Sequence, residues 1–555
     1  MIAQRTNRLL SRRGRVTLTL AATAAAACGL VAAASPAASA HPRSGDFFRP
    51  GNLLVSRTVY VDKASAIVPG VTQLPPGCTG GNCVTATANG AYPRVFNNAL
   101  VDGSFGVTAP VFLDQLTPAG QRISTLAVPD GESGHGDHLV TSFSSKSELA
   151  LNLSTSGRYV TFMGYVTKPN GIDVSNSNTP GVIDPTNPVP SAYYRVVAQL
   201  DQQGQFHYTE TNAYSGNNGR AAILSDSHGN DVIYTAGNAG NGSNPQPDGV
   251  ILGAGAQIMT PQSAPERFQW PGTPLPVGSF NVTQLGDPAD KTGKDTNFRG
   301  LTVYHNVVYL TKGSGGNGVN TVYFIDTTGH ACPTGVGLPA AGAKLPDSPI
   351  DYNPSLLQTE GVAPYNMCVL KGFNTTLAKT STNSFPFGMW FASPTTLYVA
   401  DEGNGDNTYS TTTGTYVNDA AQTTAGLQKW VLTDGSWQLA YTLTSGLKLG
   451  TPYTVPGYPT GDNKATGLPW APATDGLRNI TGRVNPNGTV TIWAITSTVS
   501  GGGDQGADPN KLVSITDQLG AITLPAKEGF TTVETARSGQ ALRGVSFTPG
   551  TGPGR

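Results

Sequence analysis

The densest group of side chains suited to catalysis in this 555-residue chain occupies residues 132–138. It brings together His135, Asp137 and His138. A histidine titrates near neutral pH, and a neighbouring aspartate can orient it for proton transfer. We therefore predict general acid–base chemistry for these three residues, with a polar, solvated loop as the alternative. Both residue types are also metal ligands, so a metal site is a further reading.

A second group of candidate residues opens a repeated strand pattern. Four repeats begin with an arginine, namely Arg220, Arg299, Arg478 and Arg543. Glu148 and Phe387 take the same place in two other repeats. Each guanidinium offers five donors that match carboxylate, phosphate or sulfate oxygens. The pattern predicts that these arginines and Glu148 bind a small anionic molecule or a polysaccharide, whereas pairing with neighbouring carboxylates such as Asp475 would make the arginines structural.

A third group is rich in oxygen donors. Asp401 and Asp406 stand in the segment Asp-Glu-Gly-Asn-Gly-Asp-Asn, whose spacing resembles a calcium loop without the terminal glutamate of an EF-hand. Calcium held by Asp401 and Asp406 is therefore a candidate cofactor. Ordinary turn chemistry is the alternative, because Asp, Asn and Gly are equally suited to turns.

The N-terminus and the cysteines indicate export. Residues 1–40 contain a basic start, an Ala-rich apolar stretch and a small-residue cleavage site, so we predict a signal peptide followed by one domain over residues 41–555. Four cysteines remain after cleavage, and an even number in an exported chain predicts two disulfides. The expected pairs are Cys78 with Cys83, and Cys332 with Cys368. We therefore expect a secreted, extracellular protein.

The composition narrows the range of partners. Charged residues make up 12% of the chain and the formal net charge is −1. This balance argues against a nucleic-acid partner, because nucleic-acid-binding proteins usually carry a basic excess. Beyond residues 1–40, no apolar run reaches the roughly 18 residues that would span a membrane. We expect a monomer without a membrane span.

The elements that must position these residues repeat along the chain. Each repeat contains two β-branched or aromatic runs joined by Gly, Asn or Asp, then a third strand and usually a fourth. Four-stranded antiparallel units repeated around a ring make a β-propeller. We predict an all-β propeller of six blades with long loops, and leave seven open because residues 264–290 could form a degenerate blade. Trp390 and Trp493 fall within strand patterns and are expected in the core.

The last repeat is incomplete. Arg543 opens a lone strand near the C-terminus, while residues 52–59, 111–116 and 122–126 supply apolar strands near the N-terminus. Joining both termini in one blade would close the ring and remove open sheet edges. In an antiparallel meander, the first strand starts at the edge where the second strand ends. The four arginines should therefore surround one mouth of the central channel, beside the loops that follow the second strands.

Three segments resemble a broad set of secreted bacterial β-propeller-like proteins of unassigned activity. They are the inner-strand Arg-Gly pairs, the Leu-Tyr-Val-Ala-Asp-Glu-Gly run from Leu397 and the Val-Phe-Leu-Asp run at Val111. The resemblance implies fold and export and transfers no catalytic residue. The favoured function is binding of an anionic or carbohydrate ligand at the arginine mouth. The alternatives are an extracellular lyase or hydrolase acting on an acidic polysaccharide or ester, and a structural or adhesive scaffold.

Overall fold

A computed structural model places Gly45–Arg555 in one compact unit. The predicted signal peptide lies outside the part of the chain that the structure describes. The described residues are 46–59, 73–74, 84–85, 108–131, 139–142, 147–169, 195–211, 213–214, 218–227, 229, 231–238, 255–262, 277–282, 297–314, 318–347, 366–380, 384–463, 466–501 and 508–552.

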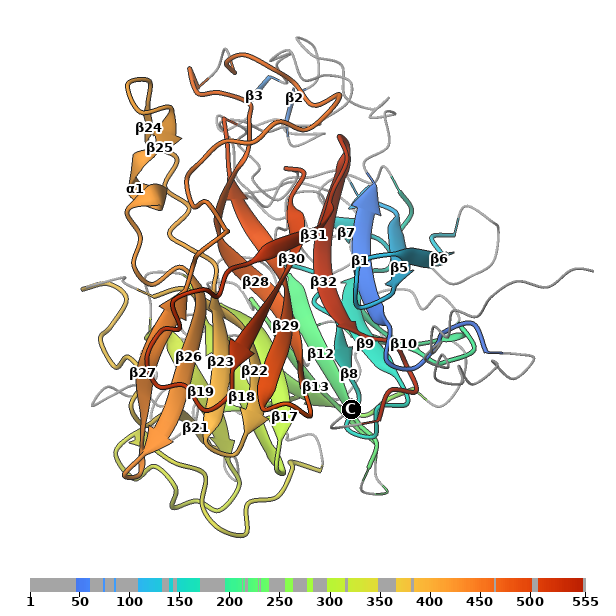
Figure 1. Ribbon diagram of the computed structural model, residues 1–555. Coiled ribbons are helices and arrows are strands. Elements are labelled where there is room, and N and C mark those ends of the chain that lie inside the picture. The colour runs from blue at the N-terminus through green and yellow to red at the C-terminus, as the bar shows by residue number, and fades with distance from the viewer. Residues whose placement is uncertain are drawn as a thin grey trace, which may run out of the picture. The chain divides into compact units, whose positions relative to one another are not determined.

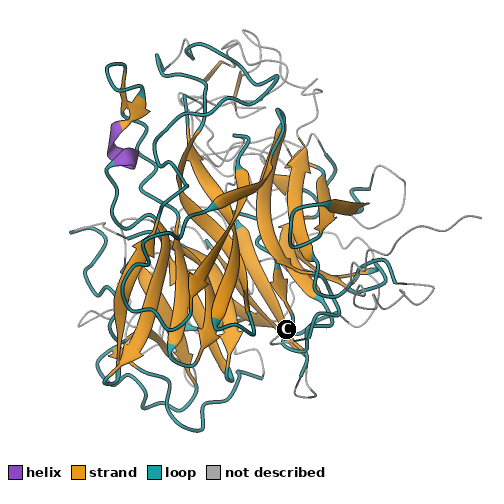
Figure 2. Cartoon of the chain, viewed as in Figure 1, coloured by secondary structure: helices purple, strands orange, loops and turns teal. Residues whose placement is uncertain are grey.

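The described residues form a ring of six antiparallel sheets, so the chain is a six-bladed β-propeller with almost no helix (Figures 1 and 2). From the channel outward, blade 1 contains β32 (Gln540–Phe547), β1 (Leu53–Val59), β5 (Val111–Leu116) and β6 (Arg122–Ala127). Blade 2 contains β8 (Asn152–Leu153), β9 (Val160–Tyr165), β10 (Arg195–Leu200) and β11 (Phe206–Thr211). Blade 3 contains β12 (Gly219–Ser225), β13 (Val232–Gly237), β14 (Ala256–Met259) and β15 (Val277–Ser279).

The second half of the chain forms the other three blades. Blade 4 contains β17 (Phe298–Tyr304), β18 (Val307–Lys312), β19 (Thr321–Asp326) and β21 (Asn366–Leu370), and the short strands β16 (Asn281–Val282) and β20 (Val336–Gly337) pair parallel to β21. Blade 5 contains β22 (Pro386–Ser393), β23 (Thr396–Asp401), β26 (Gly426–Thr433) and β27 (Ser436–Leu443). Blade 6 contains β28 (Ala473–Val484), β29 (Thr489–Val499), β30 (Lys511–Gln518) and β31 (Thr531–Thr535).

A few short elements lie outside the blades. Three two-stranded pairs are β2 (Gln73–Leu74) with β3 (Val84–Thr85), β4 (Thr108–Ala109) with β7 (Thr141–Ser142), and β24 (Tyr409–Ser410) with β25 (Thr415–Tyr416). The last pair and the single helical turn α1 (Val417–Ala420) belong to an insertion between β23 and β26.

The ring closes as the sequence predicts. The C-terminal strand β32 pairs antiparallel with the N-terminal strand β1, from Leu53 opposite Phe547 to Val59 opposite Gln540. Each inner strand also contacts the inner strands of both neighbouring blades, so β8, β12, β17, β22, β28 and β32 surround a central channel. The number of blades is six. In the described part of residues 264–290, β15 completes blade 3 and β16 joins blade 4, so these residues form no separate blade.

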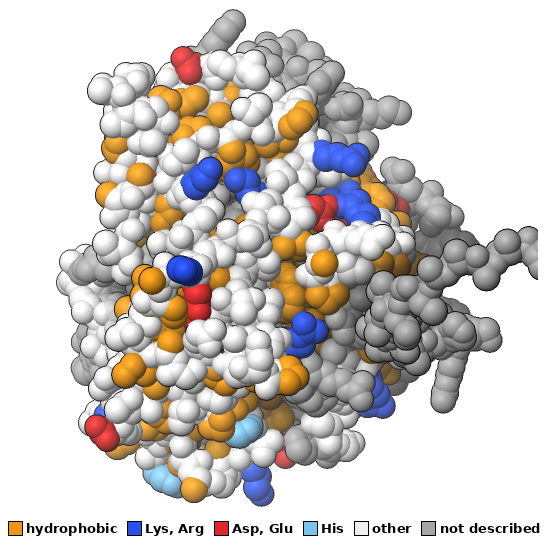
Figure 3. Space-filling model, viewed as in Figure 1, with side chains coloured by type: hydrophobic (Ala, Val, Ile, Leu, Met, Phe, Trp, Pro, Cys, Tyr) orange, Lys and Arg blue, Asp and Glu red, His pale blue; other side chains and the backbone are white. Residues whose placement is uncertain are grey.

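The core lies between neighbouring sheets. One apolar cluster joins blades 3 and 4 through side chains such as Tyr234, Ile258, Leu310 and Tyr323, which are all almost fully buried. Burying each such side chain contributes about 1.5–3 kcal/mol, so the interfaces between blades stabilise the ring. The face drawn in Figure 3 carries few and scattered charged side chains among neutral and apolar ones.

The inner-strand glycines have a steric reason. A β-carbon on Gly300 would lie 2.3 Å from the carbonyl oxygen of Phe387 in the next inner strand. A β-carbon on Gly544 would lie 2.3 Å from the carbonyl oxygen of Leu149. Any side chain would hold these backbones apart, so glycine lets the inner strands approach closely just after the arginine positions.

Candidate functional site

Four arginines from four blades converge at the end of the channel where the inner strands begin. We call Arg220, Arg299, Arg478 and Arg543 the arginine cluster. Their exposed fractions are only 4–5%, so all four guanidinium groups are withdrawn from bulk water. Arg220 and Arg299 lie at the starts of β12 and β17, whereas β28 and β32 begin earlier, at Ala473 and Gln540, so Arg478 and Arg543 lie inside their strands.

Glu402 links two members of the arginine cluster. It follows β23 in blade 5, where Phe387 replaces the arginine found in the neighbouring blades. One carboxylate oxygen lies 3.2 Å from Nη2 of Arg299, and the other lies 3.3 Å from Nε of Arg478. A single carboxylate of blade 5 therefore bridges blades 4 and 6, which gives Arg299 and Arg478 a structural role.

Hydroxyl groups complete the surroundings of Arg299. Its Nη1 donates to Oγ of Ser147 at 2.6 Å, and its Nη2 also donates to Oγ of Ser314. Ser147 precedes β8 of blade 2, and blade 3 stands between blades 2 and 4, so Arg299 reaches past the neighbouring blade. This guanidinium is well satisfied apart from Nε, which has no partner among the described residues.

Arg220 differs from Arg299 and Arg478 because no carboxylate of the described residues contacts it. Its Nη1 donates to Oδ1 of Asn297 and, at 2.8 Å, to the carbonyl oxygen of Phe298, and its Nε has no partner among the described residues. Burial lowers the pKa of Arg220 well below its usual range, and the positive charge of Arg299 lowers it further, while the charges of Glu402 and Glu148 act in the opposite direction. Arg220 is thus a buried cation whose direct contacts among the described residues are neutral.

Arg543 and Arg478 also repel each other. Burial lowers the pKa of Arg478, Glu402 opposes that effect, and the charges of Arg543 and Arg299 lower the pKa again. A cluster in which arginines depress one another's pKa favours the approach of an anion.

Glu148 accepts hydrogen bonds at the blade 2 side of the channel. Its two oxygens accept from the hydroxyl of Tyr165 and, at 2.6 Å, from Oγ1 of Thr141. The guanidinium of Arg195, a residue that sequence analysis did not select, lies 5.1 Å from the ring centre of Tyr165. Burial lowers the pKa of Arg195 to about 10, while the charges of Tyr165 and Glu148 act in the opposite direction.

Asn479 separates the arginine cluster from the rest of the channel. Its Oδ1 accepts from the backbone N–H of Val545 at 2.6 Å and of Leu151 at 3.4 Å. Val545 belongs to blade 1 and Leu151 to blade 2, so this amide of blade 6 reaches beyond its own neighbour. Together with the close approach of the inner-strand glycines, it fills the channel one residue beyond Arg478.

The other end of the channel holds a cavity of about 420 Å³, lined by residues from all six inner strands. Its lining residues come after the arginine positions in those strands. They include Tyr304, Met389, Trp390, Phe391 and Val484. Trp493 is almost fully buried, as predicted, but Trp390 lies on the cavity wall and is only partly buried. Trp390 packs against the core cluster of blades 5 and 6, as predicted, and its remaining surface lines the cavity, which strand alternation does not distinguish from a core face.

The predicted calcium ligands already accept hydrogen bonds. Asp401 accepts from the backbone N–H groups of Phe385 and Gly403 at 2.8 and 3.0 Å, and burial raises the pKa of Asp401 to about 7. Asp406 accepts from Thr408 N–H and from Nδ2 of Asn418, both at 2.8 Å. These contacts stabilise turns, and a calcium ion at this loop stays a prediction.

A third carboxyl group in the same region escaped sequence analysis. Asp419 is fully buried in α1, and burial together with Asp475 raises its pKa strongly. Asp475 accepts from Nε2 of Gln422 at 2.8 Å and from Gly405 N–H at 3.0 Å. The insertion between β23 and β26 is thus held to blade 6 by carboxyl groups.

Only one set of three potential metal-ligand residues has its ligand atoms within 4.8 Å of one another in the described part of the chain. It consists of Asp326, Cys332 and Cys368. The two cysteines form the predicted disulfide, which joins the segment after β19 to β21. Their sulfur atoms are therefore bonded to each other, and the set is a structural feature of blade 4.

Several predicted residues lie outside the described part of the chain. They are His135, Asp137 and His138, and the cysteines Cys78 and Cys83. Acid–base chemistry at the first three and a disulfide between the last two stay predictions. The described chain also holds no helix long and apolar enough to cross a membrane.

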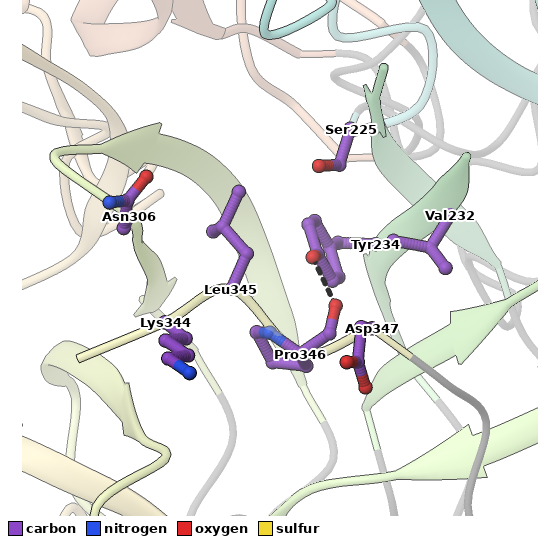
Figure 4. A pocket seen from close by; sticks show the side chains of 8 residues that line it. All are labelled: Ser225, Val232, Tyr234, Asn306, Lys344, Leu345, Pro346 and Asp347. Atoms are coloured by element: carbon purple, nitrogen blue, oxygen red, sulfur yellow. Dashed lines mark hydrogen bonds between the residues drawn. The ribbon is translucent and has the colours of Figure 1, made fainter. Parts of the chain in front are cut away.

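A smaller cavity of about 250 Å³ lies between blades 3 and 4 (Figure 4). It lies at the end of the ring where hairpins join the first and second strands of blades 2 to 6, which we call the hairpin face. Tyr234 and Pro346 form part of its wall, and the tyrosine hydroxyl donates to the proline carbonyl oxygen. Lys344 and Asp347 stand at its edge, so it combines one charge of each sign with apolar walls. The hydrogen bond from Tyr234 to Pro346 ties the segment between Cys332 and Cys368 to blade 3.

No protein-family model matches the chain, and no curated protein matches it in sequence. Among solved structures, a point mutant of Synechocystis apocarotenoid oxygenase is similar over 91% of this chain and 94% of its own, with 8% identity and a TM-score of 0.34. The ectodomain of the parainfluenza virus 5 hemagglutinin-neuraminidase matches 74% of this chain and 76% of its own, with 11% identity and a TM-score of 0.31. The Dos1 propeller matches 79% of this chain and 69% of its own, with 10% identity and a TM-score of 0.26. At these values the likenesses carry no argument about function.

Proposed function

We propose that the protein is a secreted β-propeller that binds an anionic ligand, a small anion or an acidic carbohydrate, at the arginine cluster. The observation that carries this proposal is Arg220, a buried guanidinium whose described contacts are all neutral. Glu402 and Glu148 act on its charge without contacting it. Burying an ion without a counter-ion in contact is costly, and a carboxylate, phosphate or sulfate of a ligand would lower that cost.

The arginine cluster divides into two roles under this proposal. Arg299 and Arg478 hold blades 4, 5 and 6 together through Glu402. Arg220 receives the anion, with Nε of Arg299 as a second donor. The planar guanidinium groups suit the paired oxygens of a carboxylate or phosphate. Export is supported by the disulfide between Cys332 and Cys368, since such bonds persist in oxidising compartments.

The test is thermal unfolding of the mature protein with phosphate, sulfate, oligogalacturonate and a neutral oligosaccharide, at constant ionic strength. A ligand that binds only the native state raises the free energy of unfolding by mass action, by about 2.7 kcal/mol at one hundred times its Kd. The midpoint temperature rises with it. We expect the anions to raise the midpoint and the neutral sugar to leave it unchanged. Arg220→Gln should abolish the rise.

The matched control is Arg158→Gln. Arg158 lies in the turn before β9, at the hairpin face, and its exposed side chain pairs with Asp226 at 3.3 Å. This variant should keep the anion-dependent rise. An equal rise in Arg220→Gln, or no rise with any anion in the unaltered protein, would contradict the proposal and leave the arginines as structural residues only.

A further inference from the structure

The cavity at the hairpin end of the channel differs in chemistry from the arginine cluster. Its walls are largely apolar and aromatic, and no Asp or Glu occurs among the described residues that line it. Its volume of about 420 Å³ falls in the range of small-molecule sites. Hydroxyl groups of Thr302 and Thr481 stand among the apolar side chains.

Two aromatic side chains form part of the wall of this cavity. A β-carbon on Gly482 would lie 2.6 Å from the ring atoms of Trp390, so the indole packs directly on the glycine backbone. Tyr304 is stacked on both Phe391 and His305, with ring centres 4.4 and 4.2 Å away, so both of its faces are covered. Aromatic rings also pack edge to face, so a ligand ring can contact such a wall without a free face on every side chain.

Arg483 supplies the one positive charge among the lining residues. It is partly buried, and its guanidinium carbon lies 5.8 Å from the ring centre of Trp493. It forms no ion pair with any residue in the described part of the chain. Trp493 is a core residue outside the cavity lining, so this contact holds the guanidinium at the cavity wall. A cation without a carboxylate partner among the described residues is suited to the anionic group of an otherwise apolar ligand.

We propose that this cavity is a second ligand site, which binds a small aromatic carboxylate. The aromatic part packs against the apolar wall that includes Trp390 and Met389, and the carboxylate faces Arg483. Asn479 and the inner-strand glycines separate this site from the arginine cluster, so the proposal is independent of the function proposed above. The two sites then take different anions: a polar one at the arginine cluster and an apolar one here.

The test is calorimetric titration of the mature protein with 2-naphthoate and with the neutral analogue 2-naphthalenemethanol. We expect naphthoate to bind more tightly than the alcohol. Arg483→Gln should weaken naphthoate binding at least tenfold and change the alcohol by less than threefold. Ala392→Phe, which places a ring in the cavity, should weaken both ligands.

Two control variants locate the binding. Arg158→Gln removes a cation from the same face outside the cavity and should leave naphthoate affinity unchanged. Arg220→Gln should also leave it unchanged, and a loss in that variant would place naphthoate at the arginine cluster and overturn the proposal. Unchanged naphthoate binding in Arg483→Gln, or no binding by the unaltered protein at millimolar naphthoate, would overturn it as well. If Ala392→Phe does not fold, as judged by its melting curve, the Arg483 comparison alone decides.

Discussion

The two ends of the central channel are built from the same six strands but have opposite chemistry. At the end where the inner strands start, four buried arginines, Glu148 and Glu402 form a charged and hydrogen-bonded cluster. At the end where those strands finish, aromatic and aliphatic side chains line an open cavity with the single cation Arg483. The difference arises within about four residues along each strand. It shows that a propeller can carry two distinct environments on one axis when a packed layer separates them.

The largest effect should come from removing the negative charge at the arginine cluster. Glu402→Gln keeps the size of the side chain but leaves Arg299 and Arg478 as buried cations without a counter-ion. Breaking a buried ion pair in this way costs about 3–5 kcal/mol, which urea unfolding would measure. The control is Glu534→Gln, whose partner Arg122 is 41% exposed, and whose loss should cost under about 1 kcal/mol. Equal losses in the two variants would mean that Glu402 does not hold the ring together.

A smaller loss of stability should follow from adding one methyl group to the layer of inner-strand glycines and Asn479 that fills the channel between its two ends. In Gly388→Ala the new β-carbon would lie 2.5 Å from the carbonyl oxygen of Arg478, so the inner strands must separate. Overpacking of this kind costs about 1–3 kcal/mol. Gly520→Ala is the control, because nothing lies within 4 Å of its β-carbon position. Calorimetric midpoints that fall equally for both would show that the strands do not meet closely at Gly388.

Removing the side-chain amide of Asn479, which lies between the two ends of the channel, should lower the free energy of unfolding somewhat less. Asn479→Ala leaves the buried N–H groups of Val545 and Leu151 without this acceptor, which costs about 1–2 kcal/mol. Gln438→Ala, at an exposed position of β27, is the control and should stay within about 0.5 kcal/mol. Urea unfolding compares the two. An unchanged stability of Asn479→Ala would indicate that water replaces the amide and that the channel is open between its two ends.

The smallest effect concerns the pH dependence of the insertion beside the arginine cluster. The raised pKa of Asp419 means that the native state keeps a proton that the unfolded chain releases above about pH 4. The stability from this proton is therefore present at low pH and is lost as the pH rises toward the native pKa. Asp419→Asn supplies a permanently neutral donor, so its stability should fall less between pH 5 and pH 9, by about 1 kcal/mol.

Urea unfolding at pH 5, 7 and 9 measures this difference. Asp434→Asn, in the exposed turn between β26 and β27, is the control and should follow the unaltered protein. Parallel pH profiles for Asp419→Asn and the unaltered protein would show that Asp419 is ionised in the native state.

The blade count and the closure of the ring could be read from the sequence because both depend on local periodicity. Each strand pair carries its own alternation and its own turn residues, and Gly, Asn and Asp at the hairpins report backbone conformations that other residues avoid. The position of the arginines followed from the same reasoning, since the start of an inner strand has a known place in a meander. The disulfide between Cys332 and Cys368 was predicted from the even number of cysteines in a chain expected to be exported and from the short spacing of Cys78 and Cys83, which left these two cysteines to pair.

The partners of those arginines could not be read in this way. Asp475 was the expected counter-ion, yet Glu402, which had been read as part of a calcium loop, bridges Arg299 and Arg478. Arg220 has no carboxylate contact among the residues that the structure describes, although its sequence context is like that of the other arginines. The cavity around Trp390 was missed, because the same apolar alternation serves a buried core and a channel wall.

The sequence by itself determined the all-β class, the six repeats, the joining of both termini in one blade and the presence of arginines at one mouth of the channel. These properties depend on residues that are close together in the sequence, so they can be read from local patterns. Only the tertiary structure decided which arginine is paired, where the channel is packed and where it stays open. Those outcomes depend on side chains from different blades that meet across the ring, and no spacing along the chain encodes such a meeting.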